Sequence, residues 1–311
     1  MLSRMKRFIV VAAVALAVAC RGEAPMSSSS SPSPSPSAAA PSPAVDPAKH
    51  QQEISQWQEQ RAERLKKEDS WLTLVGLFWL EEGQNVVTLP SKQTLRLTRA
   101  GEKVTLLPDA SMTVEQKPLS GPTELRNDAD PAGPAIVQMG SVRFNVIKRG
   151  ERIGLRVKDA NAPTRTQFAG LDYFPIDAKW RVDAQLEPYS PMKKIPIDDV
   201  TGMRSESDSP GALVFTLEGK EYRLDPVLEE GTDELFLIFR DETAKDETYP
   251  AGRYLYAPKP GPDGRTVIDF NKAYNPPCAF TPYATCPLPP LQNRLKTRIE
   301  AGEKRYAGGH A

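Results

Sequence analysis

Residues 71–80 read WLTLVGLFWL, and they begin a long series of short β-branched and aromatic runs. The runs that follow are NVVTL (85–89), TLRLTR (94–99), KVTLL (103–107), MTVEQK (112–117), AIVQM (135–139), VRFNVIKR (142–149) and IGLRV (153–157). Gly, Pro, Asp and Asn separate them, and no gap has room for a regular series of crossover helices, which disfavours a parallel sheet. Residues 70–162 are therefore predicted to form a first antiparallel β-sandwich domain.

A second set of strand-like runs lies within residues 163–306. They are WRVDAQL (180–186), KKIPI (193–197), GALVFTL (211–217), KEYRLDPV (220–227), ELFLIF (234–239), GRYLYA (252–257) and TVIDF (266–270). The turn GPDG at 261–264 favours hairpins, and prolines interrupt the chain from Asn275 onward. The predicted fold class is mainly β with two antiparallel β domains, the second a sandwich or barrel that ends in a proline-rich segment.

One amphipathic helix is predicted over residues 46–69. Asp46 followed by Pro47 is typical of an N-cap and a first helical position. A narrow apolar stripe follows, formed by Ile54, Trp57, Ala62 and Leu65. The helix also carries a basic run of Arg61, Arg64, Lys66 and Lys67. Glutamates are interleaved with it, so a solvated face is favoured over contact with a membrane surface.

The N-terminus, MLSRMKRFIVVAAVALAVAC, has basic residues, then an apolar run, then Cys20. Residues 1–19 are predicted to be a signal peptide, because the run is too short to span a bilayer stably. Small residues before Cys20 resemble the lipobox of bacterial lipoproteins, which predicts lipidation of Cys20 with a palmitate-bearing anchor. The alternative is an ordinary cleaved signal with a chance cysteine.

Residues 20–45 are mostly Ser, Pro and Ala, and they are predicted to form an extended tether behind the lipidated cysteine. The expected location is the cell envelope, after secretion across the inner membrane, with the chain anchored in a bacterial membrane. Arg21 after the cysteine favours the outer membrane, facing the periplasm.

Charge and histidine content exclude several classes of protein. The 311 residues include 40 Lys+Arg and 40 Asp+Glu, so no basic excess remains to neutralise nucleic-acid phosphates. The two histidines, His50 and His310, lie at the edges of the part expected to fold. This placement argues against Ser-His-Asp triads and multi-histidine zinc sites. No metal, cofactor or nucleic-acid partner is predicted.

The densest polar stretch is FRDETAKDETYPAGRYLYA, residues 239–257, which lies between two apolar strands. Together with the segment after the next strand, it supplies a candidate polar ligand site: Arg240, Asp241, Thr243, Glu247, Thr248, Tyr249, Arg253, Asp269, Asn271, Tyr274 and Asn275. Arg253 is expected to pair with Asp241 or Asp269. The leading prediction is non-enzymatic binding of a small polar ligand or an envelope partner.

Two alternatives remain for these residues. Asp241, Glu247 or Asp269 could act as acid and base in a hydrolase for a sugar or an ester, if burial separates their pKa values. The same charges could instead form a structural ion network within a protein–protein module. Carboxylates that converge in an open pocket favour the enzyme, whereas a sealed salt-bridge network favours structure.

Cys278 and Cys286 are separated by the seven residues AFTPYAT. In an oxidising compartment such a pair favours a disulfide. Free buried thiols and a metal site are the alternatives, although a zinc site would need carboxylates to complete its ligands.

The C-terminal runs FRDETAKDETYPAGRYLY, DFNKAYNPPCAFTPYATCPLPPLQNRL and IEAGEK resemble the bacterial domain-of-unknown-function 1684 (DUF1684) family, as do WLTLVGLFWLEEGQN (71–85) and GLDYFPIDAKWRV (170–182). The resemblance spans residues 55–306 and implies no established activity. It also implies that the first half is similar in outline to a forkhead-associated β-sandwich. The segment after EEGQN lacks the Gly-Arg and Ser/His features of a phosphothreonine reader, so phosphopeptide binding is not expected.

Overall fold

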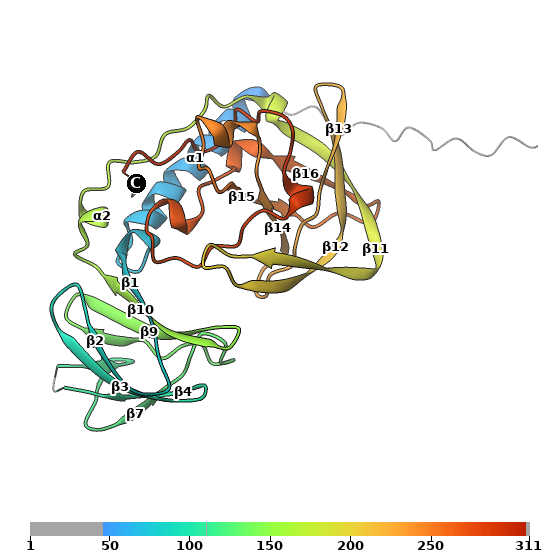
Figure 1. The fold of residues 1–311 in the computed structure, drawn as a ribbon. Helices are drawn as coiled ribbons and strands as arrows, with labels where there is room; N and C mark the ends of the chain where they lie inside the picture. The colour runs from blue at the N-terminus through green and yellow to red at the C-terminus, as the bar shows by residue number, and fades with distance from the viewer. Residues whose placement is uncertain (1–45, 110, 309–311) are drawn as a thin grey trace, which may run out of the picture. The chain divides into compact units, whose positions relative to one another are not determined.

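Helix α1 (Pro47–Lys66) begins the part of the chain that the computed structural model describes, residues 46–109 and 111–308 (Figure 1). Asp46 caps the helix, since its carboxylate accepts from the backbone N–H of Ala48 at 2.9 Å. Ile54 and Leu65 of the predicted stripe are buried. The predicted helix is confirmed, and it ends close to its expected boundary.

The predicted signal peptide, Cys20 and the tether over 20–45 lie outside the described residues, and so does His310. Within the described part of the chain, no helix has both the length and the apolar character needed to cross a membrane.

The first β region follows a short 3-10 turn, η1 (Trp71–Thr73). Its strands are β1 (Leu74–Trp79), β2 (Gly83–Thr88), β3 (Thr94–Ala100), β4 (Lys103–Leu107), β5 (Thr113–Val114), β6 (Lys117–Pro118), β7 (Thr123–Leu125), β8 (Val137–Met139), β9 (Val142–Arg149) and β10 (Arg152–Asp159). They form two antiparallel sheets, in the orders β1-β10-β9-β8-β5-β6 and β2-β3-β4-β7.

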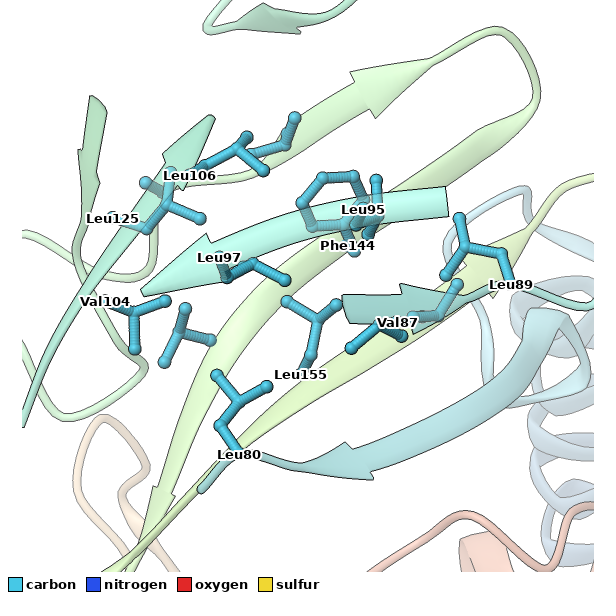
Figure 2. Close-up of a cluster of buried hydrophobic side chains, with 14 of the residues drawn as sticks. Leu80, Val87, Leu89, Leu95, Leu97, Val104, Leu106, Leu125, Phe144 and Leu155 are labelled. Carbon is cyan, nitrogen blue, oxygen red and sulfur yellow. The ribbon is translucent and has the colours of Figure 1, made fainter. Parts of the chain in front are cut away.

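Alternate residues of these strands pack the two sheets together. Leu95 and Leu97 of β3 point toward Phe144 of β9 and Leu155 of β10 (Figure 2), and all four are essentially inaccessible to solvent. Polar residues occupy the intervening positions, as expected for strands that bury one face. The mainly β, antiparallel prediction is confirmed, with sandwich character in this region.

The second β region begins at α2 (Pro163–Thr166), next to the predicted boundary after residue 162. Its other elements are η2 (Ala178–Trp180), β11 (Arg181–Asp198), β12 (Arg204–Leu217), β13 (Lys220–Leu224), β14 (Glu234–Phe239), η3 (Glu242–Lys245), β15 (Arg253–Pro258), β16 (Arg265–Asp269), η4 (Phe270–Lys272), η5 (Pro277–Ala279) and η6 (Leu291–Asn293). One antiparallel sheet has the order β13-β12-β11-β16, and β14 pairs with β15 as a hairpin. All described residues fall in one compact unit, so the division of residues 70–306 into two domains stays a prediction.

The β14–β15 hairpin is buried on both faces. Leu235 and Leu237 of β14 join the core beneath the four-stranded sheet, whereas Phe236 and Ile238 point to a second apolar cluster. Burial on both sides explains why this segment reads as a continuous apolar run instead of an alternating one. The second face of the hairpin lies toward the cavity described below.

The proline-punctuated C-terminal segment packs along this hairpin. The backbone N–H of Leu295 donates to the carbonyl of Arg240 at 2.7 Å, and Ile299 and Ala301 are completely buried. The segment is irregular, as expected from its prolines, yet it belongs to the core.

Candidate functional site

The residues of the predicted polar site separate into three groups with different partners. The first group surrounds Arg253, whose Nη2 donates to Asp241 Oδ1 at 3.0 Å and to the carbonyl of Ile299 at 2.9 Å. Its Nη1 donates to the carbonyl of Ala301. The side chains of Arg253 and Asp241 are each only 1% exposed. Arg253 therefore pairs with one of its two expected partners, in a place sealed from solvent.

Asp241 has further donors on its second oxygen. Thr243 Oγ1 donates to Oδ2 at 2.7 Å, and the backbone N–H of Ile299 donates to it at 2.8 Å. Thr248 Oγ1 lies 2.9 Å from Thr243 Oγ1. Burial lowers the pKa of Arg253, and the charge of Asp241 opposes this shift. The group fastens the C-terminal segment to the β14–β15 hairpin and matches the structural ion network that was one of the alternatives.

The second group lies nearer the surface. Glu247 Oε2 accepts from Arg298 Nη2 at 2.6 Å, and Glu247 Oε1 lies 3.6 Å from Lys304 Nζ. Tyr249 donates its hydroxyl to the carbonyl of Cys278 at 2.9 Å, and Arg240 joins the C-terminal segment through its backbone. The side chains of Glu247 and Tyr249 bind other parts of the chain, and none of these three residues lines the cavity described next.

The third group, Asp269, Tyr274 and Asn275, lines a cavity of about 1030 Å³. Asn271 donates from its backbone N–H and its Nδ2 to Asp269 Oδ1, at 3.1 and 2.9 Å, and so orients that carboxylate. Side chains of α1, β9, β10, β14, β15 and the C-terminal segment complete the lining. Of the predicted site residues, these three line this cavity.

His50 corrects an expectation from the sequence. It is 2% exposed, and its Nε2 donates to Asp269 Oδ2 at 2.7 Å. The expectation of a peripheral histidine was wrong because α1 packs its inner face against η4 and places this side chain over Asp269. The contact uses the second oxygen of the carboxylate and ties the first turns of α1 to the end of β16.

Arg61 fastens the second half of α1. Its Nε donates to Glu303 Oε1 at 2.9 Å, and its Nη2 donates to the carbonyl of Asn275 at 3.1 Å. Glu303 is fully buried, and its other oxygen accepts from the backbone N–H of Asn275 at 2.7 Å. The guanidinium also lies 4.8 Å from the ring centroid of Tyr274. Arg61 was expected on a solvated face, and instead it joins helix, C-terminal segment and cavity wall.

Aromatic rings form one wall of the cavity. Phe236 stacks on Tyr256 with centroids 4.9 Å apart, and Tyr256 is nearly parallel to Tyr274 at 6.3 Å. Burial raises the pKa of Tyr254 and Tyr274 well above the ordinary tyrosine value, so these rings stay neutral. Trp57 of α1 also lines the space. A wall of neutral rings suits an organic molecule better than a bare ion.

Two arginines from the outer face of the first β region converge on Thr285. Arg149 Nε donates to Thr285 Oγ1 at 3.3 Å, and Arg156 Nη2 donates to the same oxygen at 3.5 Å. Asp128 accepts from Arg149 at 2.8 Å, but Arg156 forms no ion pair with any residue that the structure describes. We call Arg149, Arg156 and Thr285 the anion site.

Arg156 is the least satisfied member of the anion site. Its buried Nε has no hydrogen-bond partner among the described residues. Burial lowers the pKa of Arg156, and repulsion from Arg149 lowers it further. Two like charges beside one hydroxyl, with a single carboxylate nearby, provide a place where an added anion would relieve repulsion.

The cavity lining as a whole carries more positive than negative side chains. The cationic ones are Arg61, Arg64, Arg149, Arg156, Arg181 and Lys272, and the acidic ones are Glu53, Glu229, Glu234 and Asp269. Two of the cations are already paired with carboxylates outside the lining, Arg61 with Glu303 and Arg149 with Asp128. Without these two, cations and acids in the lining are equal in number, so the preference for an anionic ligand rests on the anion site itself.

Cys278 and Cys286 are free buried thiols in this structure, where the sequence favoured a disulfide. The backbone N–H of Cys278 donates to Cys286 Sγ at 3.0 Å, so the two residues are adjacent. They belong to the apolar cluster around Phe236, which suits neutral thiols, and burial raises the pKa of Cys286. Cys286 also contributes to the cavity lining. Of the three alternatives, a disulfide, free buried thiols and a metal site, the structure therefore has the free buried thiols.

No group of three or more His, Cys, Asp or Glu side chains with metal-binding geometry occurs among residues 46–109 and 111–308. The predicted absence of a metal rests on the sequence alone.

Most residues that line the cavity were not among the site residues predicted from the sequence. Trp57, Arg61 and Arg64 recur at intervals of four and three residues, which places them on one helix face, and this spacing was a usable signal. Arg149 and Arg156 carried no such signal, because an arginine on the outer face of a strand looks like any solvated residue.

The comparison with family models bears on the second β region. Residues 166–304 match the family model described as "Protein of unknown function (DUF1684)". Among solved structures, the chain is similar to the solution NMR structure of an uncharacterized protein of Haloarcula marismortui. That similarity has 30% identity and a TM-score of 0.39, and it covers 45% of this chain and 79% of the other. No curated protein matches the chain.

Proposed function

The chain belongs to the DUF1684 family through residues 166–304, and we propose that it binds a small organic anion in the large cavity. The observation that carries the proposal is the anion site, where Arg149 and Arg156 converge on Thr285 in the cavity lining and Asp128 pairs with Arg149 alone. Two guanidinium groups that share one carboxylate repel each other, and an anion in the cavity would relieve that repulsion.

The shape and lining of the cavity fit the same proposal. Its volume of about 1030 Å³ is at the upper end of ligand pockets, and such pockets combine apolar walls with a few convergent polar groups. Here the stacked rings of Phe236, Tyr256 and Tyr274 provide the wall. The anion site provides a charged group that orients the ligand.

Binding is favoured over carboxylate-dependent hydrolysis. Of the three carboxylates considered for acid–base chemistry, Asp241 is buried against Arg253 and Glu247 is bound by Arg298. Only Asp269 faces the cavity, and both of its oxygens accept hydrogen bonds from the chain. A two-carboxylate mechanism needs both groups beside the substrate.

Tryptophan fluorescence tests the proposal on the full chain, because Trp57 and Trp71 both line the cavity. We expect saturable changes with carboxylates and phosphates such as benzoate and phenyl phosphate, and none with benzyl alcohol or benzylamine. Arg156→Gln should weaken anion binding about tenfold or more, the range for hydrogen bonds to charged groups. Arg152→Gln is the matched control, since this exposed arginine lies on the same strand and packs on Trp79.

Loss of affinity in Arg156→Gln with none in Arg152→Gln supports the assignment. Anion binding that is equal in both variants, or no binding of any anion, would refute it and favour a structural or protein–protein role.

We also propose that the chain is an envelope lipoprotein anchored at Cys20. The proposal rests on the basic, apolar and cysteine pattern of residues 1–20 and the Ser/Pro-rich stretch after it. Labelling with a radioactive fatty acid tests it. The full chain should incorporate label and fractionate with membranes, whereas Cys20→Ser should do neither, and equal labelling of both would contradict the anchor.

A further inference from the structure

The large cavity adjoins a second, smaller pocket of about 260 Å³. The two share lining residues, among them Arg149, Thr285 and Phe236, so they lie next to each other. Arg156 lines only the large cavity. The anion site therefore lies at the boundary between the two.

The small pocket is mainly apolar. Its floor consists of Ile197 of β11, Phe236 and Ile238 of β14, and the neighbouring side chains of Met203, Val227 and Leu228. Leu228 is 37% exposed although it lies among these apolar side chains, which leaves hydrophobic surface in contact with water. Covering such surface releases about 25 cal/mol per Å².

Two charged residues of the small pocket that lie outside the anion site, Asp199 and Arg204, already have partners within the chain. Asp199 accepts from the backbone N–H of Thr201 at 2.8 Å and from that of Met203 at 3.1 Å. Arg204 donates to Asp198 at 2.7 and 2.9 Å. Asp199 and Arg204 need no partner from a ligand, so a ligand in this pocket would contact mainly its apolar side chains.

From this arrangement we infer that the ligand is an amphiphilic anion, with its carboxylate or phosphate on the anion site and an apolar chain in the small pocket. The inference rests on the proposed function and adds the chemical class of the ligand. The charged end meets the unpaired Arg156, and the chain covers Leu228 and its apolar neighbours.

The volume sets the length of chain that fits. At about 30 Å³ for each water-sized group, 260 Å³ holds roughly eight such groups. A fatty-acid-like chain of about eight carbons is therefore the expected optimum, and longer chains gain little.

A homologous series of sodium carboxylates, from acetate through butyrate, hexanoate and octanoate to decanoate, tests the inference by calorimetric titration of the full chain. Affinity should rise about fourfold with each added methylene, the factor that corresponds to about 0.8 kcal/mol per buried CH₂. The rise should end near octanoate. 1-Octanol and octylammonium should bind at least tenfold more weakly than octanoate.

Met203→Trp fills the small pocket from a half-buried position without altering the anion site. It should remove the dependence on chain length and leave butyrate binding unchanged. Met192→Trp is the matched control, because Met192 is exposed and lines neither pocket, and it should keep the full dependence.

The outcomes separate the two proposals. Anion binding with no dependence on chain length overturns the amphiphile and leaves the proposed function standing. A dependence that persists in Met203→Trp also overturns the assignment of the small pocket. If no carboxylate binds, or octanol binds as well as octanoate, both proposals fail.

Discussion

Replacing Arg253 by methionine should destabilise the protein more than any other single arginine change. Methionine replaces the aliphatic part of the arginine side chain but has no guanidinium, so the substitution removes the ion pair with Asp241 and the donors to the carbonyls of Ile299 and Ala301. It leaves Asp241 buried at 1% exposure without its cation.

The magnitude follows from that burial. Removing one partner of a buried ion pair costs about 3–5 kcal/mol, because the remaining charge is uncompensated. Asp241 keeps its hydrogen bonds from Thr243 and from the backbone of Ile299, which favours the lower half of this range. Removing both charges, in Arg253→Met with Asp241→Asn, should cost less than the sum of the two single losses by at least about 1 kcal/mol.

Urea unfolding of the full chain, followed by tryptophan fluorescence, measures these losses as changes in the free energy of unfolding. Arg204→Met is the control, since this arginine pairs with Asp198 on the surface and should leave the midpoint unchanged. A loss below about 1 kcal/mol for Arg253→Met, or additive losses in the double variant, would refute the view that this pair fastens the C-terminal segment.

Three further predictions concern α1, the buried tyrosines and the thiols. His50→Ala should lower the free energy of unfolding by about 2 kcal/mol, because it removes a hydrogen bond to a carboxylate, whereas Lys49→Ala on the exposed face should have no effect in the same urea assay. Burial raises the pKa of Tyr254, so its neutral form contributes stability that is fully present below about pH 10 and is lost as pH rises through the folded-state pKa. Absorbance at alkaline pH should therefore show this tyrosine ionising only with unfolding, and reversible ionisation of every tyrosine in the folded protein near pH 10 would contradict it. Cys278 and Cys286 should both titrate as free thiols in the unreduced protein after unfolding and react slowly before it, and no thiol after unfolding would establish the disulfide instead.

The strands and the helix were readable from local patterns. Alternation in TLRLTR and VRFNVIKR predicts half-buried strands, and these segments are β3 and β9. Asp46 and Pro47 predict the start of α1, because an aspartate at the N-cap accepts hydrogen bonds from the free backbone N–H groups of the first turn. These features depend on neighbours along the chain, so a single sequence contains the information.

The role of the polar stretch 239–257 could not be predicted from local sequence patterns. Its charges alternate in a way that suits either a ligand site or an ion network, and only burial distinguishes the two. Arg253 proved to be sealed, because residues 299–303, which lie 46 and more positions away in the sequence, close over it.

The anion site and His50 depend entirely on the tertiary structure. Arg149, Arg156 and Thr285 come from segments more than 120 residues apart, and His50 meets Asp269 across more than 200. Local sequence determines whether a segment forms a strand or a helix, since backbone preferences and hydrophobic periodicity act over a few residues. The packing of distant elements determines which polar side chains share a cavity. Burial of these side chains, and their contacts with one another, arise only when those elements meet.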